Sequence, residues 1–95
     1  MAAFFIANVT VKDPEKFQAY AAKAGETMKK YHGEVALRGK FEQGLKGDAD
    51  HHAVAVVRFP SHDDLRSWYF SEAYQAVIPL RDEAAEMSIT TYVEP

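Results

Sequence analysis

The residues with the clearest potential for chemistry lie in one aromatic segment, "RFPSHDDLRSWYFSEAYQAVIPLR", which runs from Arg58 to Arg81. Arg81 follows Tyr74 by seven positions, so a helix would place both on one face, where an apolar residue is expected. A guanidinium in such a place needs a carboxylate, a carbonyl oxygen or a bound anion as its partner. The segment therefore indicates either an anion-binding site or a buried ion pair.

Two interpretations of Arg81 follow from this requirement. In the first, Arg81 orients the carboxylate or enolate of a ligand, and Tyr69 acts as a proton-transfer group. The aromatic residues that would form the wall of that pocket are Trp68, Tyr69 and Tyr74. In the second, Arg81 pairs with an acid such as Asp48 or Glu94, or extends to solvent along its aliphatic stem. The aromatic residues then belong to the core or to a subunit interface.

The histidines offer another candidate for proton transfer but not a metal site. His51 and His52 are adjacent, and adjacent residues of a strand point to opposite faces, so they do not hold one ion together. His32 and His62 stand at no spacing that adds ligands, and we expect neither a metal nor a cofactor. His52 is a candidate base if it faces the interior of a barrel; the alternative is a strand end in water.

Three polar residues elsewhere are candidates for ligand binding. Asn8 lies among apolar neighbours in an expected strand, where its amide must be hydrogen-bonded, either to a ligand or to the protein. Arg58 shares a strand face with His52, at the opposite end of an apolar patch. Arg38 lies in the strand that precedes a turn. Each of these two arginines is either a site residue or a solvated charge.

Composition limits the function classes. The chain has 95 residues, 47% of them hydrophobic, a formal net charge of −3 and no cysteine. The length predicts one domain over residues 1–95. The eleven basic residues form no dense run, which argues against nucleic-acid binding. No apolar run approaches the roughly 20 residues that span a bilayer, and "MAAFFIANVTV" lacks the basic region of a signal peptide. We expect a cytoplasmic protein.

The expected elements alternate as β-α-β-β-α-β. Alternating or apolar runs predict strands at residues 3–11, 34–45, 51–59 and 86–94, the second with a bulge near Gly39. A helix begins after Asp13 and ends at Gly33, which we expect in the left-handed conformation. A second helical region restarts near Ser71 and is kinked at Pro79. This order is typical of the α+β, ferredoxin-like fold, with helices on one face of an antiparallel four-stranded sheet.

The first and third expected strands are apolar on both faces, which has a consequence for assembly. A sheet face that meets water alternates to polar residues, and helices on one side cannot cover both Phe4 and Phe5, or both Ala55 and Val56. Burial of each large apolar side chain contributes about 1.5–3 kcal/mol. A two-fold dimer that packs sheet against sheet achieves that burial. We therefore predict a homodimer whose two sheets form a shared barrel.

Motifs along the whole chain carry a family resemblance: "IANVTVKDPEKFQAY", "YHGEVALRG", "KGD", "RFPS", "WYFSEAYQ" and "LR". Together they resemble an uncharacterised bacterial family, the domain of unknown function 1330, of the dimeric α/β-barrel superfamily. The resemblance implies the dimeric barrel fold but no reaction, substrate or cofactor. Similar proteins carry an acid before the Gly-Asp turn and another before Phe-Pro, where this chain has Lys46 and Arg58. This difference puts any acid–base chemistry through those carboxylates in question.

Three functions remain open from the sequence. One is a cofactor-free enzyme acting on a small carboxylate or carbonyl compound, with Arg81 as anion holder, His52 or Tyr69 as proton-transfer group and Asn8 as orienting residue. Another is a non-catalytic dimer that binds a small acid in a cleft. The third is a structural or interaction dimer whose aromatic residues serve only the core and interface. A deep cavity that Arg81 faces would favour the first two.

Overall fold

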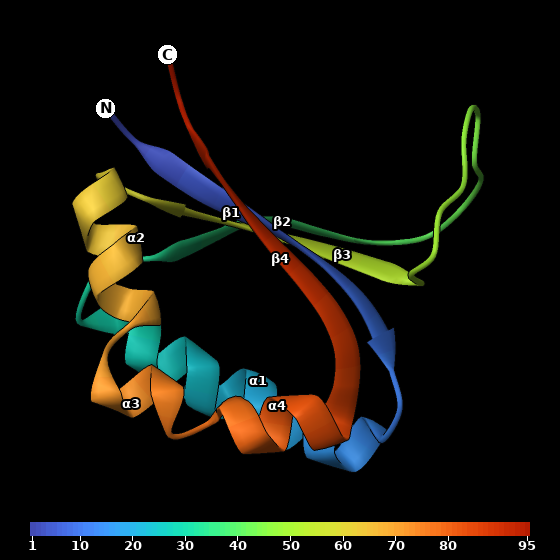
Figure 1. Cartoon of the computed structure of the whole chain (residues 1–95), viewed down its shortest axis with the longest axis horizontal. Coiled ribbons are helices and arrows are strands. Elements are labelled where there is room, and N and C mark those ends of the chain that lie inside the picture. The colour runs from blue at the N-terminus through green and yellow to red at the C-terminus, as the bar shows by residue number, and fades with distance from the viewer.

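The computed structural model describes all residues 1–95 and contains one antiparallel sheet with every helix on the same side of it (Figure 1). The elements in chain order are β1 (Ala3–Val11), α1 (Pro14–Lys29), β2 (Glu34–Lys40), β3 (Ala53–Phe59), α2 (His62–Tyr69), α3 (Glu72–Gln75), α4 (Ile78–Ala84) and β4 (Ala85–Val93). The strands are ordered β2-β3-β1-β4. The predicted α+β, ferredoxin-like arrangement of four antiparallel strands is confirmed.

The core lies between the helices and one face of the sheet. The buried residues of β1 are Ala3, Phe5, Ala7 and Val9, and the half-buried residues that alternate with them are Phe4, Ile6, Asn8 and Thr10. Strand periodicity explains this pattern, because successive side chains point to opposite faces. From the helical side, Trp68 of α2 stacks on Phe5, with ring centroids 5.2 Å apart and planes 12° apart. This contact fixes α2 on the sheet.

Helix α1 begins as the sequence predicts but ends differently. The side chain of Asp13 accepts a hydrogen bond from the Lys16 amide at 3.1 Å, which caps the first turn. At the other end His32, not Gly33, adopts the left-handed conformation, with φ of 64°. The Gly33 amide donates to Met28 O at 3.1 Å and closes a Schellman motif. The expected left-handed Gly33 is therefore wrong, because histidine tolerates this region and occupies the position itself.

Gly33 instead allows a close contact between the backbone after α1 and the ring of Phe59. A Cβ atom built on it would lie 2.7 Å from Cε2 of Phe59, a side chain that is 1% exposed. The ring of Phe59 packs against Trp68, with centroids 5.5 Å apart. Only a residue without a side chain lets the backbone after α1 approach the core this closely.

The second helical region consists of three short helices. Ser61 caps α2 and Ser71 caps α3, each through its hydroxyl oxygen, so the predicted restart at Ser71 is confirmed. Pro79 lies in the first turn of α4 and starts a new helix instead of kinking a continuous one. The difference arises because proline has no amide to donate, which costs nothing in a first turn.

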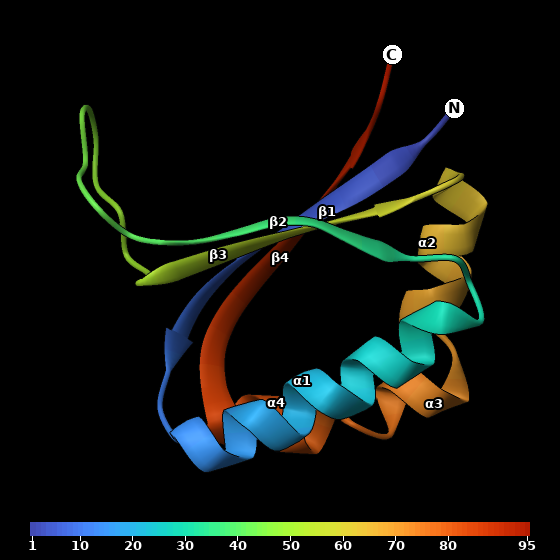
Figure 2. The ribbon, with the colours of Figure 1, turned by 180° about the vertical axis from the view of Figure 1, so that it is seen from behind.

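Strands β2 and β3 are shorter than expected. The register of β2 shifts between Val35 and Leu37, so the bulge lies before the predicted Gly39. The strand ends at Lys40 instead of residue 45, and β3 begins at Ala53 instead of residue 51. The segment between them forms an arm that projects beyond the sheet (Figure 2). Its most exposed apolar side chain is Leu45, which is 90% exposed.

One face of the sheet has no helix over it, as both ribbon views show. We call it the open face; its residues on β1 and β3 are Phe4, Ile6, Asn8, Thr10, Val54, Val56 and Arg58. Ile6 lies opposite Val56, and Phe4 stacks on Tyr92 of β4 with ring centroids 5.2 Å apart. The expected division of apolar side chains between two faces is therefore present. None of the helices has the length and apolar content needed to cross a membrane.

Two glycine substitutions test the packing around α1. Gly33→Ala should lower the free energy of unfolding by about 1–3 kcal/mol, because the buried Phe59 ring must move to admit a methyl group. Gly25→Ala is the matched control, since nothing lies within 4 Å of the position that its Cβ atom would take. It should raise stability by about 0.5–1 kcal/mol through helix propensity. Urea denaturation measures both, and equal stabilities for the two variants would contradict the close-contact role of Gly33.

Candidate functional site

Arg81 of α4 forms hydrogen bonds with two tyrosine hydroxyl groups. Its Nη1 atom donates to Tyr69 Oη and to Tyr74 Oη, both at 3.2 Å. Its Nε atom donates to Oδ1 of the neighbouring Asp82 at 3.1 Å. The side chain of Arg81 is 16% exposed, whereas that of Asp82 is 65% exposed. The partner of this mostly buried guanidinium is therefore a pair of phenols and a solvated carboxylate, and not Asp48 or Glu94.

A hydrogen bond between Tyr74 and Tyr20 extends the contacts of Arg81 into the core. Tyr74 is fully buried, and its hydroxyl lies 2.8 Å from that of Tyr20, which is 6% exposed. Burial raises the pKa of Tyr20 well above its ordinary value, and the neighbouring Tyr74 hydroxyl raises it further. Burial opposes the charge of Arg81, but the hydrogen bonds to Tyr69 and Tyr74 outweigh it and leave the pKa of Arg81 above its usual range. Arg81 therefore carries a fixed positive charge beside neutral phenols.

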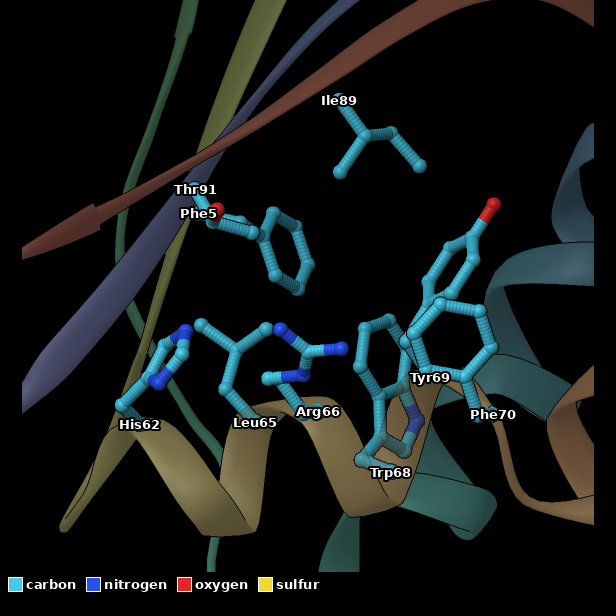
Figure 3. A pocket seen from close by; sticks show the side chains of 9 residues that line it. All are labelled: Phe5, His62, Leu65, Arg66, Trp68, Tyr69, Phe70, Ile89 and Thr91. Carbon is cyan, nitrogen blue, oxygen red and sulfur yellow. The ribbon is translucent and has the colours of Figure 1, made fainter.

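A pocket of about 330 Å³ lies between α2 and the sheet (Figure 3). Its lining residues are Phe5, His62, Leu65, Arg66, Trp68, Tyr69, Phe70, Ile89 and Thr91. Figure 3 shows side chains of β1 and β4 on one side and those of α2 on the other, with His62 and Tyr69 at opposite ends. The volume lies in the range of small-molecule sites. The pocket is a candidate binding site for a compact, mostly apolar molecule.

The charges around this pocket have one sign. No aspartate or glutamate lines it, although the whole chain has a net charge of −3. Arg66 lies at the pocket with its guanidinium carbon 5.9 Å from the centre of the Phe70 ring. Arg81 does not line the pocket, but it contacts Tyr69, which does. Positive charge near a pocket attracts an anionic oxygen, or one on which negative charge develops.

Trp68 and Tyr74 are held in place by the core. Trp68 is 1% exposed, contributes to the pocket wall, and donates from Nε1 to Thr27 Oγ1 at 2.9 Å. The ring of Tyr74 lies 4.4 Å from that of Trp68 and 5.1 Å from that of Tyr69, measured between centroids. Tyr74 lines no part of the pocket. Tyr74 therefore packs against Trp68 and Tyr69 from the core side, and those two residues line the pocket.

The other residues singled out in the sequence lie elsewhere. Asn8 and Arg58 are on the open face, and Arg58 forms a two-pronged ion pair with Glu94 at 2.6 and 3.4 Å. Arg38 lines a separate open groove of about 470 Å³ between α1 and the edge of the sheet. His52 is exposed just before β3, where its amide donates to Val9 O at 2.9 Å. The structure brings Trp68, Tyr69, Tyr74 and Arg81 together and leaves these four apart.

Sequence reasoning missed part of the pocket. His62, Arg66 and Phe70 follow one another at intervals of four residues, which places them along one face of α2. This spacing was a usable signal. Ile89 and Thr91 come from β4, and no sequence pattern marked them as pocket residues, because only the sheet register brings them next to Phe5. Tyr20 appeared in the sequence only as one apolar position of a helix.

Comparison with known proteins identifies a family. Residues 2–94 match the family model described as "Domain of unknown function (DUF1330)". No curated protein sequence is significantly similar to the chain.

Solved structures share the fold at low sequence identity. A protein of unknown function from Rhodopseudomonas palustris superposes with a TM-score of 0.80 and 19% identity, over 99% of this chain and 84% of that chain. SnoaB, a cofactor-independent oxygenase from Streptomyces nogalater, gives a TM-score of 0.72 and 14% identity, over 99% and 93% of the two chains. A dimeric ferredoxin-like protein of unknown function from Thermobifida fusca gives 0.66 and 13%, over 99% and 92%.

Removal of one buried hydroxyl tests the tyrosine cluster. Tyr74→Phe should lower the free energy of unfolding by about 1–3 kcal/mol, because Arg81 and Tyr20 lose a partner in a site closed to water. Tyr31→Phe is the matched control, since Tyr31 lies at a surface groove beside α3 and away from the open face. It should change stability by less than about 0.5 kcal/mol. Thermal and urea unfolding followed by circular dichroism measure both, and an unchanged Tyr74 variant would contradict a stabilising hydrogen-bond cluster.

Proposed function

We propose that this chain, which belongs to the DUF1330 family, forms a homodimer whose subunits each bind a small aromatic or apolar molecule bearing a carboxylate or carbonyl oxygen. The binding site is the pocket beneath α2. One observation carries the proposal: the pocket combines an apolar, aromatic wall with one arginine, Arg66, and no acidic residue. Such a lining binds the body of a flat molecule by burial and its oxygen by hydrogen bonds and charge.

Each part of the ligand has a counterpart in the pocket. The apolar body lies against Phe5, Ile89 and the edge of Trp68. Arg66, which is exposed at the pocket, attracts a carboxylate there. Tyr69, whose hydroxyl accepts a hydrogen bond from Arg81, lies at the end of the pocket away from His62 (Figure 3). This arrangement differs from the direct contact between Arg81 and a ligand that the sequence suggested, since Tyr69 stands between them.

The homodimer is supported by the open face. It exposes Ile6, Val56 and the Phe4–Tyr92 stack to water in an isolated chain, and a second copy would remove these side chains from water at about 25 cal/mol per Å² of buried apolar area. The Asn8 amide, which has no side-chain hydrogen bond within the chain, would find its partner across such an interface. The Thermobifida fusca protein with the same fold is described as dimeric.

A cofactor-free reaction on the bound ligand is the second candidate. The oxygenase from Streptomyces nogalater has the same fold, and a shared fold alone does not carry a reaction. The observation in this chain that favours it is the hydroxyl of Tyr69, a residue that is polarised by Arg81 and lines a mostly apolar pocket. Such a group would hold a proton at the ligand oxygen and stabilise negative charge there.

Ligand binding is tested with 2-naphthoate and 2-naphthalenemethanol as probes. We expect 2-naphthoate to raise the Tm and to bind more tightly than the neutral alcohol in calorimetry. Arg66→Gln should weaken the binding of 2-naphthoate by about two- to fivefold, the effect of an exposed charge. It should leave the affinity for the alcohol unchanged. Arg38→Gln, in the separate groove, is the control. Ile89→Trp should fill the pocket and abolish binding of both probes. If neither probe binds at millimolar concentration, the proposed pocket function fails.

Assembly is tested by placing a charge on the open face. Light scattering of the unaltered protein should give twice the 10.7 kDa mass of the chain. Ile6→Glu should give the single-chain mass, because the carboxylate would have to be buried unpaired between two sheets. Ala22→Glu on the exposed side of α1 is the control and should remain dimeric. A folded single chain in the unaltered protein would refute the homodimer.

A further inference from the structure

We infer that Arg81 is a positioning residue that fixes the Tyr69 hydroxyl with its proton directed at the ligand, so that the pocket selects molecules presenting an acceptor oxygen at that end. The inference rests on the proposed function and deepens it, because it names the polarity of the ligand atom. It also assigns Arg81 an indirect role, through Tyr69, in place of direct contact with an anion.

The direction of the hydrogen bond is dictated by chemistry. A guanidinium has only donors, so in the contact between Arg81 Nη1 and Tyr69 Oη the tyrosine oxygen must accept. The proton of Tyr69 is left to point elsewhere, and no atom of the protein accepts it. The side chain of Tyr69 lines the pocket. A ligand oxygen with a free lone pair would accept the proton of this hydroxyl in a hydrogen bond. A ligand N–H group would not, because two donors cannot bond to each other.

The guanidinium that imposes this direction is itself immobilised. The same Nη1 atom also donates to Tyr74 Oη at 3.2 Å, and Tyr74 is fully buried and linked to Tyr20. The Nε atom is held by Asp82 at 3.1 Å. These three hydrogen bonds leave Arg81 little freedom to turn. Tyr74 is thus committed to the protein, and Tyr69 alone among the three tyrosines of the cluster lines the pocket.

The charge of Arg81 reinforces the preference. Its nearest carboxylate, Asp82, is 65% exposed and therefore largely screened by water. The positive charge behind Tyr69 is not cancelled within the core, so a hydroxyl bonded to it is a stronger donor than one bonded to water. Carbonyl, carboxylate and enolate oxygens all benefit, and those with the most negative charge benefit most. The class of ligand is therefore an aromatic ketone, acid or enolisable carbonyl compound.

The test compares two probes of the same shape. Methyl 2-naphthyl ketone has an acceptor oxygen where 2-isopropenylnaphthalene has a CH₂ group. In the unaltered protein the ketone should bind about tenfold more tightly, the effect of one neutral hydrogen bond. Tyr69→Phe should remove this preference. Arg81→Met should reduce it to about threefold or less while leaving the affinity of the alkene unchanged, and combining the two substitutions should add no further loss.

A second readout needs no ligand. Tyrosine ¹³Cζ chemical shifts respond to a hydrogen bond accepted by the phenol oxygen, and the Tyr69 signal is assigned by its absence in Tyr69→Phe. Arg81→Met should move this signal and leave that of Tyr92 in place. Circular dichroism shows whether each variant is folded. Arg81→Lys keeps the charge but not the fork of donors. It should fold and give a ketone preference between that of the unaltered protein and that of Arg81→Met.

The outcomes separate the two claims. If Arg81→Met weakens ketone and alkene equally, Arg81 acts only on the shape of the pocket and the inference is overturned, while the binding function stands. An unshifted Tyr69 signal in folded Arg81→Met also overturns it. If neither naphthalene probe binds to the unaltered protein, the proposed function fails, and a moved Tyr69 signal still supports the positioning role of Arg81.

Discussion

The helices of this protein cover one face of its sheet, and most of the remaining structure depends on that restriction. A strand that is largely apolar on both faces needs burial on both sides, yet the four helices all lie beneath the face of Phe5 and Val9. The covered face therefore becomes the core and the site of the pocket. The open face carries Phe4, Ile6 and Val56, the residues on which the proposed dimer contact depends. The position of the pocket, the proposed ligand site and the proposed assembly all follow from this one-sided covering of the sheet.

Within the covered layer, α2 determines where space is left. Trp68 stacks on Phe5 and anchors the helix near its C-terminus, while Gly33 lets the chain after α1 approach Phe59 closely. The helix is therefore packed tightly on the side of β3, and the space of about 330 Å³ remains on the side of β4, where Ile89 and Thr91 line it. A pocket that keeps its shape without a ligand would lower the entropic cost of the binding proposed above.

Much of this could be predicted from the sequence, and what could not has physical reasons. Strand alternation, the caps at Asp13 and Ser71 and the family motifs are local signals; they predicted the element order, the ferredoxin-like fold and the family, and all three are confirmed. The left-handed His32 and the bulge before Leu37 depend on tertiary packing that competes with local propensity, so glycine positions misled the prediction.

The candidate site was predictable only in part, for a similar reason. The sequence marked Arg81 as a cation in an apolar stripe and left three partners open: a ligand anion, a protein acid and solvent. The structure gives Arg81 two phenol oxygens on the core side and the exposed carboxylate of Asp82 on the other. Phenols suit this position because they accept hydrogen bonds while adding no negative charge that would cancel the guanidinium. An acid in the place of Tyr69 would have neutralised the pocket and repelled a carboxylate. Because the carboxylate partner of Arg81, Asp82, is 65% exposed, the guanidinium keeps its positive charge behind Tyr69 in an acidic protein. This charge is the physical basis for expecting an electron-rich oxygen near that tyrosine.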